Sequence, residues 1–273
     1  MRCFSSFVGI MRYEFRMQIR RIAVWIVPVL LIAFQFGLNR MWLPHSMGSF
    51  LYKSSFDEHV AFDSALLHIS ALLASNANLF LPLGVGILMA DRLLRDRNAM
   101  MEELVQALSV PVGVRILGKY LGNLGATLLP VLLCYGIGVA YLCWLVRDIL
   151  AVFYGVLCFA VIMLPGMLFV SAFSLAGPAF FGTNLYRFLF ICYWFWGNLL
   201  RPGYGVPTIS RTILTPVGMV IANGFFGVTI IADSGLMVVS PFEGLESLLA
   251  LVGTALVVLG ILWGYVSWQQ RRC

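Results

Sequence analysis

Long apolar stretches without charged residues alternate with short polar segments along most of the chain. Five of these stretches are 18 to 28 residues long, and a sixth, shorter stretch carries Arg187 near its start. A helix of about 20 residues crosses the roughly 30 Å hydrocarbon core of a bilayer. The pattern therefore predicts six membrane-spanning helices, at residues 22–39, 69–90, 121–146, 149–176, 185–200 and 247–267.

A further apolar stretch, residues 212–232, is interrupted by Pro216, Gly218 and Gly224, which weaken a straight helix. Irregular backbone persists at membrane depth only where protein or a water-filled cavity surrounds it. The pattern leaves two alternatives for this stretch, a re-entrant hairpin or an interfacial helix packed flat on the bundle. Either alternative places it in an outer segment, residues 201–246, before the last span.

The first 21 residues follow a different pattern. Apolar side chains recur every three or four residues, as on one face of a helix, while most of the arginines lie off that face. The apolar positions are Phe4, Val8, Met11, Phe15, Ile19 and Ile22. A basic amphipathic helix of this kind lies along the inner leaflet, whose anionic lipids attract its arginines.

The composition supports a membrane location. Hydrophobic residues make up 61% of the 273 residues and charged residues 11%, whereas an average soluble domain is about half apolar and about a quarter charged. The chain is therefore expected to be an all-α integral membrane protein. A disordered chain, a disulfide-stapled secreted domain and a nucleic-acid binder are excluded as leading classes, and the six cysteines show no metal-binding or redox spacing.

The distribution of positive charge predicts the orientation. Six spans with a cytoplasmic N-terminus place 13 arginines and lysines in the cytoplasm and five outside. An excess of positive charge on the cytoplasmic side is the rule for membrane proteins. A seventh span would export Arg271 and Arg272, so the charges favour six spans with both termini cytoplasmic, in a bacterial-type plasma (inner) membrane.

The segment between the second and third predicted spans begins with a charged cluster that includes Asp96 and Arg97. A short helix is expected at residues 99–112, with Glu102 and Gln106 on one face and apolar side chains on the other. An acidic face of this kind suits the docking of a soluble partner. The alternative is the solvated face of an ordinary loop.

Several chemistries find no support. Residues 113–120 nearly match a phosphate-binding loop, but Tyr120 stands where that loop needs a serine or threonine for magnesium. The predicted spans contain no Asp, Glu or Lys, and their only histidine would be His68 at a boundary, which argues against intramembrane catalysis and proton-coupled transport. His59 and Asp63 are four residues apart, but an isolated pair is usually solvated surface, so no metal site is expected there or at His45.

Polar and aromatic residues inside the spans are the candidates for a translocation path. Tyr186, Phe190, Trp194 and Asn198 fall at intervals of four, and two asparagines lie in the second predicted span. Such side chains either line a path or pack and hydrogen-bond between helices, and packing is the commoner role. The candidate path residues are Asn76, Asn78, Phe190, Trp194 and Asn198.

A local signature follows the charged cluster. It consists of Arg97, Glu103-Leu104, Pro111 and Leu117-Gly118-Lys119. Together with the amphipathic N-terminal helix, the six spans and the long outer segment before the last span, it resembles the permease subunit of a type-2 ABC exporter over nearly the whole chain.

The resemblance implies an elbow helix at residues 1–21 and a coupling helix at residues 99–112. It further implies that two permeases pair as a homodimer or heterodimer, and that each rests on a soluble ATPase subunit. ATP and magnesium would belong to that partner, so this chain would bind no cofactor and would not be an enzyme. The implied ATPase contact residues are Asp96, Arg97, Glu102, Glu103 and Gln106.

The function that the resemblance implies is export of a drug-like amphiphile, a peptide or a lipid-linked molecule. An ATP-independent channel or a structural membrane subunit is the alternative. Neither alternative would need the acidic helix at residues 99–112.

Overall fold

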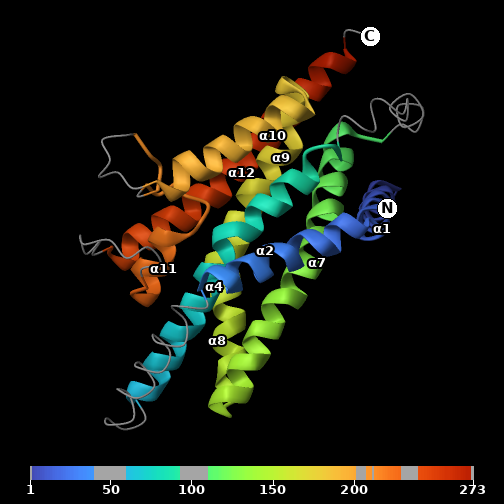
Figure 1. Cartoon of the computed structure of the whole chain (residues 1–273). Helices are drawn as coiled ribbons and strands as arrows, with labels where there is room; N and C mark the ends of the chain where they lie inside the picture. Colours follow the sequence, from blue (N-terminus) through green and yellow to red (C-terminus); the bar gives the residue numbers. More distant parts are fainter. Residues whose placement is uncertain are drawn as a thin grey trace.

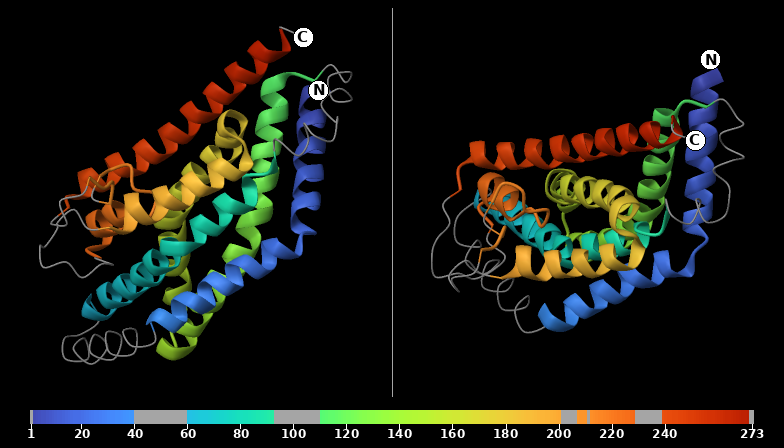
Figure 2. Two further views of the ribbon diagram at one scale, coloured as in Figure 1. Left: turned by 45° about the horizontal axis from the view of Figure 1, so that its top comes forward. Right: turned by 90° about the horizontal axis from the view of Figure 1, so that it is seen from above.

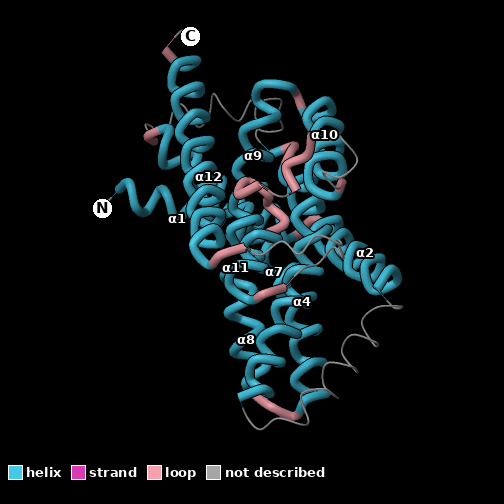
Figure 3. The backbone as a smooth tube through the Cα atoms, turned by 90° about the vertical axis from the view of Figure 1, so that its left-hand side faces the viewer, coloured by secondary structure: helices cyan, strands magenta, loops and turns pink. Residues whose placement is uncertain are grey.

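The computed structural model describes residues 2–39, 60–92, 110–200, 207–210, 212–228 and 239–271. Helices make up 87% of these residues, which include no strand (Figure 3). The elements are α1 (Arg2–Ile19), α2 (Ile22–Asn39), α4 (Val60–Met89), α7 (Val112–Val146), α8 (Leu150–Cys158), the π-helix η1 (Phe159–Met163), α9 (Leu164–Phe181), α10 (Thr183–Cys192), the π-helix η2 (Tyr193–Leu199), α11 (Met219–Phe226) and α12 (Pro241–Gln270). The prediction of an all-α protein is confirmed for this part of the chain.

Four of the described helices are long and apolar enough to cross a membrane. They are α4, α7, the run from α8 through α9, and α12. A fifth is reached if α1 and α2, which meet at a 62° bend, are counted as one broken span. The chain therefore has the character of a multi-pass helical membrane protein, whereas a sixth span, at residues 185–200, stays a prediction.

Several helices begin before the predicted spans. Helix α7 starts at Val112 with Pro111 as its N-cap, and it includes Gly113. Helix α7 therefore begins directly after Pro111 and runs through Gly113, although both residue types commonly interrupt helices. The reason is that proline is tolerated at a helix start, where its missing N–H has no partner to lose. The last residue of the predicted 99–112 helix belongs to α7 instead.

The helix ends gather at two opposite ends of the bundle (Figures 1 and 2). At one end lie α1, the last turn of α4, the start of α7 and the C-terminal end of α12. There Phe180 packs on Tyr265 with 4.8 Å between ring centroids. At the other end lie α11 and the turn between α7 and α8, and His68 Nδ1 is 3.3 Å from the carbonyl oxygen of Phe226.

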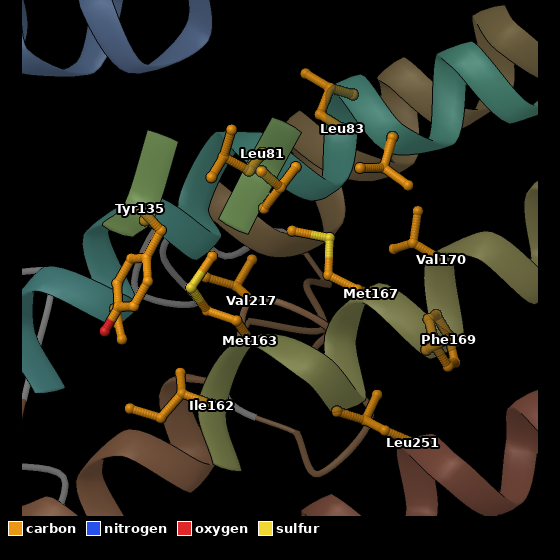
Figure 4. Packing of buried hydrophobic residues seen from close by; sticks show 14 of the residues in the cluster. Leu81, Leu83, Tyr135, Ile162, Met163, Met167, Phe169, Val170, Val217 and Leu251 are labelled. Carbon is orange, nitrogen blue, oxygen red and sulfur yellow. The ribbon is translucent and has the colours of Figure 1, made fainter. Parts of the chain in front are cut away.

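Helices α4 and α9 form the centre of the bundle. In the most apolar windows of the candidate spans, 56% of the residues are buried in α4 and in the α8–α9 run, against 28% in α7 and in α12. Figure 4 shows Leu81 of α4, Met163 and Met167 together with Val217 of the outer segment, all members of the main buried cluster. The outer segment thus contributes to the core, while α7 and α12 turn apolar faces outward, as lipid contact requires.

Helix α1 lies alongside the first half of α7 (Figure 2). A Cβ atom on Gly122 would lie 2.5 Å from the carbonyl oxygen of Met11, and one on Gly118 would lie 3.0 Å from the Ile10 side chain. Small residues at this spacing let two helices approach closely in a membrane. The pair Gly118 and Gly122 therefore serves packing within the chain.

Candidate functional site

The residues expected to contact an ATPase lie in a connection that the structure does not describe. The structure describes residues up to Arg92 and again from Val110 onward. The residues in question are Asp96, Arg97, Glu102, Glu103 and Gln106, and their role stays a prediction. His45 and His59 also lie outside the described residues, and Asp63 is exposed in the first turn of α4.

Asn78 connects α4 to the outer segment from inside the bundle. Its side chain is fully buried, and its amide nitrogen lies 2.9 Å from the carbonyl oxygen of Val217 and 3.1 Å from that of Pro216. The carbonyl oxygen of Ile162 in η1 is 3.4 Å away. Peptide groups in an apolar interior need hydrogen-bond partners, so Asn78 stabilises irregular backbone that could not otherwise lie there.

Two glycines allow the outer segment to lie directly against η1 and α9. A Cβ atom on Gly166 would collide with the carbonyl oxygen of Pro216. Gly218 has a φ of +76°, a backbone conformation that side-chain-bearing residues rarely adopt, and the carbonyl oxygen of Ile162 lies 3.1 Å from the position of its missing Cβ. Side chains at either position would separate the two surfaces.

Asn198 of η2 bonds to the turn at residues 212–218. Its Oδ1 accepts a hydrogen bond from Thr215 Oγ1 at 3.1 Å, and the neighbouring carbonyl oxygen of Gly197 accepts one from the Ile209 amide at 2.7 Å. Both residues belong to η2, and Ile162, beside Asn78, belongs to η1. Short π-helices are rare and are found frequently at functional sites. Here both of them contact the outer segment.

The aromatic residues of α10 and η2 stack inside the bundle. Ring centroids are 5.8 Å apart for Tyr186 and Phe190, and 5.9 Å apart for Phe190 and Trp194. A Cβ atom on Gly86 of α4 would collide with the Phe190 ring, and Trp194 Nε1 donates to the carbonyl oxygen of Leu79 at 2.9 Å. These two candidate path residues therefore pack α10 and η2 onto α4.

Asn76 faces a different neighbour. Its side chain donates to the carbonyl oxygen of Leu72 in its own helix at 2.9 Å, and its carbonyl oxygen accepts a hydrogen bond from the buried Gln35 side chain of α2. The five candidates thus divide into groups. Asn78 and Asn198 meet at the turn of residues 212–218, whereas Asn76 contacts α2.

A second polar cluster, between α1 and α7, was not predicted from the sequence. The Glu14 side chain is buried, and its carboxylate accepts a hydrogen bond from Asn123 Nδ2 at 3.1 Å. Gln18, one turn further along α1, is fully buried, whereas Phe4 on the predicted apolar face is 73% exposed. A glutamate and a glutamine four residues apart, on a helix otherwise rich in arginine, were the available signal.

Replacing Asn78 with leucine should lower the free energy of unfolding by about 1–3 kcal/mol, because it leaves buried carbonyl oxygens of the outer segment without a donor. Thermal unfolding in detergent would measure the change. Thr254→Val is the matched control, since Thr254 Oγ1 donates to the carbonyl oxygen of Ala250 in its own helix. Equal melting temperatures for the two variants would contradict the assigned role of Asn78.

The arrangement suits packing of irregular backbone against apolar helices. Among the residues that the structure describes, no three His, Cys, Asp or Glu side chains are grouped as metal ligands would be. Comparison with known proteins adds no relative: no family model, curated protein or solved structure matches the chain.

Proposed function

We propose that the chain is the membrane-embedded permease subunit of an ATP-driven exporter, which acts beside a separate soluble ATPase subunit and a second permease subunit. The supporting observation is the gathering of α1, both ends of the connection at residues 93–109 and the end of α12 at one end of the bundle. A soluble partner that binds at that end could contact all of these elements and so transmit its motion to the bundle.

The proposed topology has six spans, with α10 and η2 as the fifth. It places 13 of the 18 arginines and lysines at the end that carries α1, and this end faces the cytoplasm of a bacterial-type inner membrane. The outer segment then lies at the opposite face. Helix α10 and η2 together are short, but Arg187 lies near their start, where a long basic side chain reaches the interface.

The proposed path follows α4, α10 and η2 and includes Asn76, Asn78, Phe190, Trp194 and Asn198. The hydrogen bonds of Asn78 and Asn198 to the outer segment would correspond to a closed outer end. Passage of a drug-like amphiphile, a peptide or a lipid-linked molecule therefore requires the turn at residues 212–218 to move away from Asn78 and Asn198.

Reversing two charges in the proposed coupling helix should abolish association with the ATPase. We expect Glu102→Lys with Glu103→Lys to reduce the co-purifying ATPase at least about tenfold, since opposite charges across an interface give it specificity. The measurement is a pull-down of the tagged chain from mildly solubilised membranes, followed by mass spectrometry and an ATPase assay.

The matched control is Asp63→Lys with Glu246→Lys, which makes the same charge change at exposed positions of the other end. The control should recruit the ATPase normally, and both variants should insert into the membrane. Undiminished recruitment by the Glu102 and Glu103 variant would exclude the coupling-helix assignment.

The alternative function is a structural membrane subunit or an ATP-independent channel. One observation favours a structural role: the candidate path residues are engaged in packing and hydrogen bonds inside the chain. Repeated purification of the wild-type chain without any ATPase, in progressively gentler detergents, would favour this alternative over the exporter.

A further inference from the structure

Helices α1 and α2 meet at a bend that hydrogen bonds hold in place. Helix α1 ends at Ile19, α2 begins at Ile22, and their axes differ by 62°. The Arg21 amide donates to the carbonyl oxygen of Gln18 at 3.1 Å, and Trp25 Nε1 donates to that of Ile19 at 2.9 Å. Carbonyl groups at the end of α1 therefore have partners that fix where the chain turns.

The bend is bonded to the end of α4. Arg21 Nη1 lies 3.2 Å from Asp91 Oδ2 and 3.4 Å from Asp91 Oδ1, and the two side chains are 22% and 31% exposed. Asp91 follows α4 by two residues and precedes the connection at residues 93–109. A half-buried pair attracts more strongly than one surrounded by water, because the local dielectric constant is lower.

Helix α1 itself packs on α7, the helix that follows the same connection. Met11 and Glu14 lie against Gly122 of α7, and Glu14 accepts the hydrogen bond from Asn123. The α1–α2 junction thus bonds through Arg21 to Asp91, just past the end of α4, and α1 bonds through Glu14 to α7. A displacement of the end of α4 or of α7 would therefore act on α1 and α2 through these two contacts.

We propose that Arg21 and Asp91 are positioning residues that tie the α1–α2 bend to the C-terminal end of α4, so that a displacement of that end is passed to α1 and α2. The tie itself is a property of this chain alone. The identity of the displacing partner as an ATPase rests on the proposed function.

Spin labels on each side of the bend would measure its angle directly. Gly9 of α1 has nothing within 4 Å of the position of a Cβ atom, and Leu30 of α2 is 60% exposed, so both positions have room for a labelled cysteine. The purified full chain, with its native cysteines replaced by alanine, would be examined by double electron–electron resonance. We expect a narrow distance distribution for this background.

Charge reversal and charge exchange then test the pair. Arg21→Asp and Asp91→Arg should each broaden or shift the distance distribution. The double variant, which exchanges the two charges, should restore it. Such a restoration would not follow if the two side chains merely filled space. Arg20→Asp, an exposed neighbour with the same charge change, should leave the distribution unchanged. Single variants with the parent distribution, or a double variant that fails to restore it, would overturn the tie. If the Arg21→Asp variant does not insert into the membrane, Arg21→Gln is used in its place.

The same labels in the complete complex test the transfer of motion. ATP should change the label distance in the parent chain, and this change should be lost in Arg21→Asp and return in the double variant. A nucleotide response that persists in Arg21→Asp would overturn the transfer. If no ATPase partner exists, the proposed function fails, but the distances in the isolated chain still decide whether the tie is real.

Discussion

Replacing Gly166 with alanine should destabilise the folded protein by about 3 kcal/mol, at the upper end of the usual cost of overpacking. The added methyl group would collide with the carbonyl oxygen of Pro216, which is backbone and cannot swing aside as a flexible side chain can. Relief requires the turn at residues 212–218 to move, which also stretches the hydrogen bonds that Asn78 donates to it. Thermal unfolding of the purified chain in detergent would measure the loss.

Gly253→Ala is the matched control for Gly166→Ala. Gly253 lies in α12 with nothing within 4 Å of the position of a Cβ atom, so alanine there should be neutral or slightly stabilising. A melting temperature for Gly166→Ala equal to that of the control would mean that the outer segment does not lie against α9.

Replacing Gly122 with alanine should cost about 2–3 kcal/mol and should loosen α1 from α7. A Cβ atom there would lie 2.5 Å from the carbonyl oxygen of Met11 and 2.8 Å from Glu14 Cβ, and neither atom lies at the end of a flexible side chain. Separation of the helices would also weaken the bond between Glu14 and Asn123. Limited trypsin digestion, which cuts after the arginines of α1, should become faster.

Gly136→Ala provides the comparison on the same helix, because nothing lies within 4 Å of that position. It should leave both the melting temperature and the rate of cleavage in α1 unchanged. Cleavage of Gly122→Ala at the rate of Gly136→Ala would show that α1 does not depend on close approach to α7.

The apolar cores of the helices could be predicted because a bilayer demands long uncharged stretches, and each of the six predicted span ranges lies within helix apart from at most one terminal residue. The starts of the helices could not be predicted from hydropathy, because a helix extends through polar sequence as far as a capping signal. Helix α12 begins at Pro241, after Ser240, whose side chain forms a capping box with Glu243. That four-residue signature was present in the sequence and marks the start of the helix better than hydropathy does.

The candidate site was predictable in its residue types and unpredictable in its partners. Spacing by four placed Tyr186, Phe190 and Trp194 on one helix face, and these residues do share a buried face. Their partners, such as the carbonyl oxygen of Leu79 for Trp194, come from distant parts of the chain. The π-helices η1 and η2 leave no trace in a periodicity of 3.6 residues, because a single extra residue shifts the pattern only locally.

The outer segment has a consequence for the order in which the chain assembles. Helix α11 has only eight residues, too few to be stable alone. Its neighbourhood is held by other elements, since Ser247 of α12 donates to the carbonyl oxygen of Ile213 at 2.8 Å, and Asn78 and Asn198 hold the turn. We therefore expect residues 212–228 to become ordered only after α4, η2 and α12 have come together.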